Sequence, residues 1–179
     1  MTRLELEHII RAAASISGDD EIVIFGSQAI LAQFPDAPQA MRRSIEAGVF
    51  PRNKPERWDL VDGSIGEGSM FHDTFGYYAQ GVEERTAVLP AGWQQRLVPI
   101  CNANTRGATG LALEVHDLLV SKIIAGRDKD VAFLREAAKH GLADGQVVLR
   151  RLDESPAARR VKEAARARIL RAFGVTGQT

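Results

Sequence analysis

The chain has 179 residues, of which 45% are hydrophobic and 26% are charged, a composition typical of a soluble globular protein with a buried core. Basic and acidic residues number 23 each, so the formal net charge is zero, which excludes a strong global attraction to nucleic acid. A single cysteine, Cys101, excludes an internal disulfide framework, and without an apolar run of ~20 residues or a signal peptide we expect a cytoplasmic protein with no membrane partner.

The first part of the chain alternates helical and strand patterns. Apolar residues recur at helical spacing between residues 4 and 14 and predict an amphipathic helix. The β-branched run at 22–25 predicts a buried strand that stops at Gly26-Ser27, and the run at 28–34 predicts a helix. A second strand is expected at 44–50, where Pro51 ends it, and the two strands are expected to be neighbours in one sheet.

The middle of the chain gives weaker signals. A helix is expected to start near Lys54-Pro55, with Trp58 and Ile65 on its buried face. Residues 71–76 are expected to form a loop or short turn, and 77–82 and 96–101 to form strands. The polar segment 102–110 predicts a mobile loop.

From residue 113 onward the pattern is helical, with helices predicted at 115–125, 128–139, 144–152 and 156–173. The fold class predicted is therefore α+β (mixed α/β). Residues 1–112 are expected to form a small mixed sheet with flanking helices, and 113–179 a C-terminal helical bundle packed on it as one compact unit.

The Gly26-Ser27 turn is the first candidate site. A strand that breaks into a helix leaves unpaired N–H groups and a partial positive charge at the helix start. Glycine lets a ligand approach the backbone, and Ser27 adds a hydroxyl, so the turn is suited to a phosphate. The alternative is a turn with a structural role alone.

The second expected strand carries Glu46 and Gly48 on one side, by the two-residue period of a strand. With the Gly-Ser turn before it, this organisation resembles the nucleotidyltransferase (polymerase β-like) superfamily, and more closely a bacterial group labelled DUF6036, related to nucleotidyltransferases of toxin–antitoxin systems. The resemblance covers most of the chain. The segments that carry it are Phe25-Gly-Ser27, Arg43-Ser-Ile-Glu46, Ile65-Gly-Glu-Gly, Phe71-His-Asp-Thr-Phe-Gly-Tyr-Tyr, Leu89-Pro-Ala-Gly-Trp, His116-Asp-Leu-Leu-Val-Ser-Lys122 and Ala125-Gly-Arg-Asp-Lys-Asp130.

The resemblance implies transfer of a nucleoside monophosphate from an NTP to an RNA or protein acceptor, with a cognate toxin or antitoxin as a further partner. It implies that Gly26 and Ser27 hold the phosphates, that Ser27 and Glu46 are catalytic, and that Glu46 ligates Mg²⁺ or Mn²⁺. The family pattern has two carboxylates, one residue apart on this strand, that hold the divalent metal. Glu46 stands at the first of these positions, but Gly48 stands at the second. A degenerate member that binds a nucleotide or a partner protein without catalysis is therefore the alternative.

Basic residues form further candidates for nucleotide binding. The resemblance places Lys122, Arg127, Lys129 and Asp130 at the site. Arg43 is a further candidate, since it precedes the expected strand that carries Glu46. Lysine can bind a triphosphate as a compact positive charge, and arginine can donate two parallel hydrogen bonds to phosphate oxygens. The alternative is an ion-pair set that pins two helices, with Lys122 bound to Asp117 or Asp130.

Three weaker signals remain. His72, in its aromatic segment, is a candidate for base stacking or for a packing role. Arg135 and His140 match the loose Arg-x4-His spacing of HEPN ribonucleases, although the strands before them argue against that all-helical fold. The arginine-rich run at 159–171 predicts either an RNA-binding module or the solvated face of a terminal helix.

Overall fold

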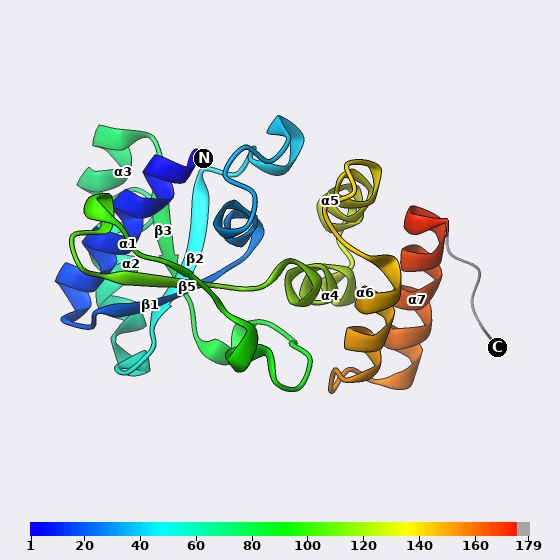
Figure 1. The fold of residues 1–179 in the computed structure, drawn as a ribbon. Helices are drawn as coiled ribbons and strands as arrows, with labels where there is room; N and C mark the ends of the chain where they lie inside the picture. The colour runs from blue at the N-terminus through cyan, green and yellow to red at the C-terminus, as the bar shows by residue number, and fades with distance from the viewer. Residues whose placement is uncertain (175–179) are drawn as a thin grey trace. The chain divides into compact units, whose positions relative to one another are not determined.

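The computed structural model describes residues 1–174, which form two compact units (Figure 1). The sheet unit consists of Met1–Thr86 and Leu97–Leu113. The helical unit consists of Ala87–Arg96 and the chain from Glu114 onward. The chain therefore enters the helical unit briefly, returns to the sheet unit to complete it, and then leaves again.

The sheet has five strands in the order β3-β2-β1-β5-β4. They are β1 (Glu21–Phe25), β2 (Glu46–Pro51), β3 (Tyr78–Gly81), β4 (Val98–Ile100) and β5 (Thr109–Ala112). Strand β1 is central because its apolar β-branched residues suit burial on both faces. It pairs antiparallel with β2 and parallel with β5, so the sheet is mixed.

Helix α1 (Arg3–Ser17) packs on one face of the sheet. Thr2 and Glu5 form a capping box at its start, and Gly18 ends it in a left-handed conformation. A Cβ at Gly110 of β5 would lie 2.4 Å from Cδ1 of Ile10 and 2.9 Å from Cδ1 of Ile24. The helix can approach the strands this closely because residue 110 has no side chain.

Helix α2 (Trp58–Ile65) packs against β3, where a Cβ at Gly81 would lie 2.1 Å from the Trp58 carbonyl oxygen. Residues 70–75, predicted as a loop or turn, form the short helix α3 (Met70–Phe75). The Ser69 hydroxyl accepts a hydrogen bond from the His72 N–H, and Gly76 closes the helix with φ 76°. Both caps lie outside the six helical residues, whose own pattern is weak.

Within residues 1–174, six 3₁₀ turns join these elements, namely η1 (Ser27–Ala32), η2 (Gln39–Met41), η3 (Pro55–Arg57), η4 (Glu84–Thr86), η5 (Trp93–Arg96) and η6 (Ala103–Thr105). The segment 102–110, predicted as a mobile loop, is ordered by Asn102, whose side chain accepts from the N–H groups of Asn104 and Thr105. Its last residues then pair with β1 as part of β5.

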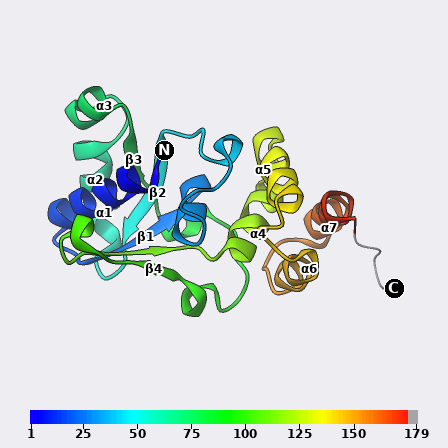
Figure 2. The same cartoon turned by 45° about the horizontal axis from the view of Figure 1, so that its top comes forward.

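The helical unit contains α4 (Val115–Ala125), α5 (Asp128–Lys139), α6 (Gly145–Asp153) and α7 (Arg159–Phe173). The bounds of α4 and α5 agree with the predicted ones, because Gly126 ends α4 in a left-handed conformation with φ 67°. Helices α6 and α7 lie side by side in Figure 1 and Figure 2.

The mixed α+β fold class is confirmed. Among residues 1–174, none of the helices has both the length and the apolar character that a membrane-spanning segment needs.

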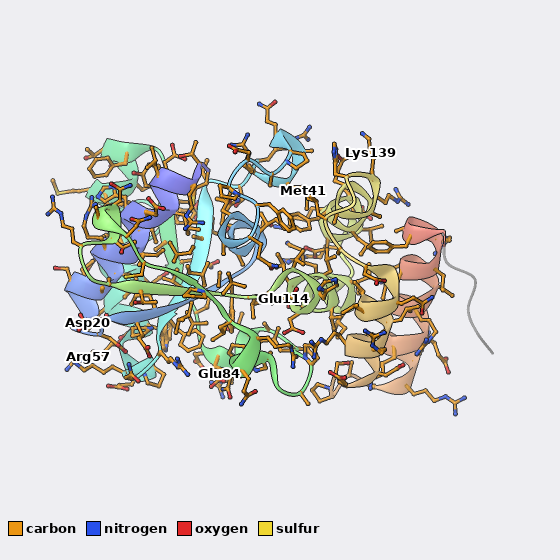
Figure 3. All side chains as sticks on the ribbon, in the orientation of Figure 1. Asp20, Met41, Arg57, Glu84, Glu114 and Lys139 are labelled. Atoms are coloured by element: carbon orange, nitrogen blue, oxygen red, sulfur yellow. The ribbon has the colours of Figure 1, made fainter. Side chains whose placement is uncertain are left out.

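Two polar clusters fix the helical unit. Asp117, with no exposed side-chain surface, accepts hydrogen bonds from Arg96 Nε at 2.8 Å and Nη2 at 3.0 Å. Glu114, labelled at the start of α4 in Figure 3, lies 2.6 Å from Nδ1 of His116, and Nε2 of the same ring accepts from the Asp144 N–H. The first cluster joins η5 to α4, and the second joins α4 to the start of α6.

Candidate functional site

The Gly26-Ser27 turn follows the central strand directly. Gly26 has φ 75° and ψ −168°, a region open almost only to glycine. Gly26 is exposed, and no atom lies within 4 Å of an added Cβ. Glycine is therefore required here by its backbone conformation, because the space beside it is open.

The helix predicted at 28–34 is wrong in type and extent. The segment forms η1, a 3₁₀ helix of six residues that ends at Ala32. Pro35 follows closely and disfavours helical geometry at Phe34. A short 3₁₀ helix aligns few peptide dipoles, so the positive charge at its start is smaller than an α-helix would give.

The pairing of β1 with β2 places the turn near the start of β2. Phe25 is opposite Gly48 at the end of this ladder, and η1, which starts at Ser27, contacts β2, which starts at Glu46. The prediction that these two strands are neighbours in one sheet is confirmed. Glu46 and Gly48 lie on the same face of β2, since the ladder to β3 runs through residues 46–49 without a bulge.

On the side of β3, Glu46 contacts Tyr78, whose ring in turn contacts His72. Tyr78 is its register partner on β3, and the Tyr78 hydroxyl donates a long hydrogen bond of 3.5 Å to Oε2 of Glu46. The ring of His72 lies 4.7 Å from that of Tyr78, centroid to centroid. The structure therefore joins two predicted site residues, Glu46 and His72, through a tyrosine.

Tyr78 lies in an acidic environment. Burial raises the pKa of its hydroxyl, and the charges of Glu46, Glu67 and Asp62 raise it further. Tyr78 therefore stays protonated and acts as a donor toward Glu46. His72 is held by its own turn, because its Nδ1 accepts from the N–H of Gly68 at 3.1 Å.

The implied metal can be compared with these donors. Glu46 offers one carboxylate, and Gly48 offers no side chain. No group of three His, Cys, Asp or Glu residues suited to a metal ion occurs in the part of the chain that the structure describes. Mg²⁺ is commonly held by one or two carboxylates together with substrate phosphates, so the donor set fits an ion that arrives with a nucleotide.

Position 48 has room for a side chain. A Cβ there would lie 3.7 Å from both Cβ and the carbonyl oxygen of Phe25, which is ordinary van der Waals contact. Its backbone does not have the positive φ that would favour glycine. The glycine is therefore not imposed by the strand geometry around it.

Of the predicted cations, Lys122, Arg127 and Lys129 lie in the helical unit, and Arg43 lies in the sheet unit. Nζ of Lys122 is 3.3 Å from Oδ1 of Asp130, and Nε of Arg127 is 2.7 Å from Oδ2. Lys122 also lies over the ring of Phe133, 4.6 Å from its centroid. Of the alternatives for Lys122, the ion pair is the one with Asp130, because Asp117 is bound by Arg96 and Arg151.

Burial and the neighbouring charges shift the pKa of Lys122, and likewise that of Asp130, in opposite directions. Burial lowers the pKa of Lys122, although the charge of Asp130 raises it in part. Burial alone would raise the pKa of Asp130, but hydrogen bonding from Arg127 and the charge of Lys122 leave it below its ordinary value. Arg43 and Lys129 are exposed, and the roles of all these residues toward a nucleotide stay predictions.

Two residues of the site carry roles that the sequence did not assign. Tyr78 was part of a recognised aromatic segment, and its place on a strand opposite Glu46 is the signal that would have singled it out. Gln28 is fully buried, and its Nε2 donates to the Ser44 carbonyl at 3.1 Å. A glutamine in an otherwise apolar run was its only signal, and it ties η1 to the start of β2.

A family model described as a nucleotidyltransferase of unknown function, DUF6036, matches residues 4–175. The chain belongs to this family. The match confirms the family resemblance, and the roles of Gly26, Ser27 and Glu46 stay predictions. Comparisons with curated proteins and with solved structures give no significant match. The DUF6036 description supports a nucleotidyltransferase-like function in general terms and names no acceptor.

Proposed function

We propose that this DUF6036 chain transfers a nucleoside monophosphate from an NTP to an RNA or protein acceptor, within a toxin–antitoxin or defence system. The observation that supports the proposal is the pairing of β1 with β2 together with the contact between η1 and β2, because the turn ends β1 and Glu46 starts β2. A phosphate-binding turn beside a carboxylate is the minimum arrangement for nucleotidyl transfer.

In this proposal the backbone and hydroxyl of Gly26-Ser27 hold the nucleotide phosphates, and Glu46 carries the negative charge that a divalent cation requires. Bound Mg²⁺ or Mn²⁺ would neutralise the triphosphate and activate the attacking hydroxyl. Tyr78 keeps the Glu46 carboxylate oriented through its hydroxyl. His72 is placed, through Tyr78, to support that orientation.

The proposal is tested with each of the four NTPs labelled on the α-phosphate, Mg²⁺ and a bacterial lysate. Label that enters RNA or protein, and that disappears with Glu46→Gln, is the expected result. Nuclease and protease treatment of the product identify the acceptor class. If every NTP leaves all macromolecules unlabelled, transfer to an acceptor in that lysate is ruled out.

A catalytically degenerate nucleotide- or partner-binding member is the second candidate. Gly48 favours it, because the second acid of the family's pair is absent and the structure leaves space there for a side chain. This candidate predicts that labelled NTPs bind with no transfer. Equilibrium binding measured on the samples used for the transfer assay separates the two candidates.

A further inference from the structure

A pocket of about 630 Å³ lies between α5 and α7, and all its lining residues belong to the helical unit. Its charged lining consists of Arg135, Arg168, Arg171 and Asp128, and Val131 and Leu134 supply apolar wall. A volume of this size is in the range of small-molecule sites. None of these residues belongs to the Gly26, Ser27 and Glu46 site.

The described lining of the pocket gathers positive charge that its acids do not neutralise. Three guanidinium groups face one carboxylate, a formal excess of two positive charges. Among residues 1–174, none of the three arginines has a carboxylate oxygen within ion-pair distance. Other arginines of α7 are paired, Arg159 with Glu163 and Arg166 with Asp153. The three pocket arginines therefore differ from these two in lacking an acidic partner in the described part of the chain.

Two of the arginines are held by backbone carbonyls, and all three retain unused donors. Nη1 of Arg168 donates to the Ile123 carbonyl at 3.4 Å, and a Cβ at Gly126 would lie only 2.6 Å from that nitrogen. Nε of Arg171 donates to the Ala167 carbonyl at 3.2 Å. Arg135 makes no hydrogen bond or ion pair with any residue that the structure describes. Each guanidinium has five N–H donors, so most remain available.

We propose that this pocket binds phosphate groups of a ligand. Guanidinium forks match phosphate oxygens in pairs, and the excess of two positive charges matches a phosphate dianion. None of the described residues lining the pocket is aromatic, so the pocket supplies no platform on which a base would stack. The phosphates come from a free phosphorylated molecule or from an RNA backbone, and the two sources share this chemistry.

The experiment is isothermal titration of the full chain in EDTA, with inorganic pyrophosphate and separately with a ten-nucleotide single-stranded RNA. The pocket variant is Arg135→Gln with Arg171→Gln. The matched control is Arg150→Gln with Arg160→Gln, which removes the same charge from two exposed arginines of the helical unit outside the pocket. We expect the pocket variant to weaken binding at least tenfold and the control to change it less than twofold.

A third variant is expected to bind pyrophosphate more tightly, a result that misfolding would not produce. Asp128→Asn removes the only acid among the described residues of the pocket lining, and we expect it to tighten pyrophosphate binding about two- to fivefold. Melting temperatures of all variants are measured alongside. Equal weakening in the pocket and control pairs, or no binding of either ligand by the unaltered chain, overturns the proposal.

The two ligands distinguish the source of the phosphate. If an RNA backbone is the ligand, the slope of log affinity against log salt for the RNA falls by about 1.4 in the pocket variant, about 0.7 for each lost contact. If a free phosphorylated molecule is the ligand, pyrophosphate binds at least as tightly as the RNA. Because the titration involves no transfer, its outcome is separate from that of the nucleotidyltransferase assay.

Discussion

Nζ of Lys122 lies 3.3 Å from Oδ1 of Asp130, and this pair joins α4 to α5 with 8% and 0% of the two side chains exposed. Arg127 reaches the same carboxylate from the solvent side, with 61% of its side chain exposed. Burial makes the two charges interdependent, because removal of either leaves the other without its partner in a poorly solvated place.

Replacement of Lys122 by methionine keeps the aliphatic stem and removes the charge. We expect a loss of about 3 kcal/mol in the free energy of unfolding, measured by urea denaturation, because Asp130 keeps only the exposed Arg127. Lys129→Met is the control, since Lys129 is exposed and its loss should cost under about 0.5 kcal/mol. Unchanged stability together with lost nucleotide binding would instead establish Lys122 as a ligand of the nucleotide.

Acid should destabilise the protein through Asp130. Its pKa in the folded chain lies below the ordinary value of 3.8, so the unfolded chain takes up a proton first as the pH falls. The stability that this carboxylate contributes is complete above about pH 4 and is lost as the pH falls through the lowered folded pKa. Asp130→Asn should flatten this part of the curve, measured as the unfolding free energy between pH 6 and pH 2.

If a missing acid limits activity, Gly48→Asp should raise nucleotidyl transfer at least tenfold and tighten Mg²⁺ binding, because removal of one electrostatic element commonly costs about 10²–10³ in rate. The contact of 3.7 Å with Phe25 leaves room for the first side-chain atom. Transfer rate and thermal stability are measured on the same samples, with Gly48→Asn as an uncharged control. A stable Gly48→Asp protein with an unchanged transfer rate would mean that position 48 is not the position of the missing metal-binding acid.

Gln28 positions the Gly-Ser turn, and its replacement by methionine should show this. The change removes the hydrogen bond to the Ser44 carbonyl, but it also removes Oε1, which is buried without a hydrogen-bond partner among residues 1–174. The two effects oppose each other, so we expect a stability loss of only about 1 kcal/mol. Binding of a fluorescent nucleotide should weaken more than stability does. Equal effects on both would limit Gln28 to a packing role.

Much of the helical unit could be predicted from the sequence, because its signals are local. Gly126 and Gly141 follow periodic apolar runs, and glycines in left-handed conformations stand at both positions. The exception is the start of the last helix, predicted at 156 and found at Arg159. The residues before it, from Pro156 onward, leave Ala158 in an extended conformation as the cap.

The sheet was less predictable because its strands depend on partners that are distant in the sequence. Strand β5 lies in a segment rich in Gly, Asn and Thr, and only pairing with β1, about 88 residues earlier, makes it a strand. Arg96, predicted as the first residue of a strand, instead ends η5 and binds Asp117. In the candidate site, the pairing of β1 with β2 and the face shared by Glu46 and Gly48 were predictable, but Tyr78 required the β2–β3 register.

The bond between Arg96 and Asp117 bears on how this chain can be divided. Arg96 precedes the last two strands of the sheet unit in sequence, yet its guanidinium neutralises a carboxylate with no exposed surface in α4. A fragment that starts after the sheet would lose this arginine and keep only the more distant Arg151, at 3.7 Å. The helical unit is therefore not a segment that can be cut out and expressed by itself, and recombination between relatives must exchange residues 87–96 together with it.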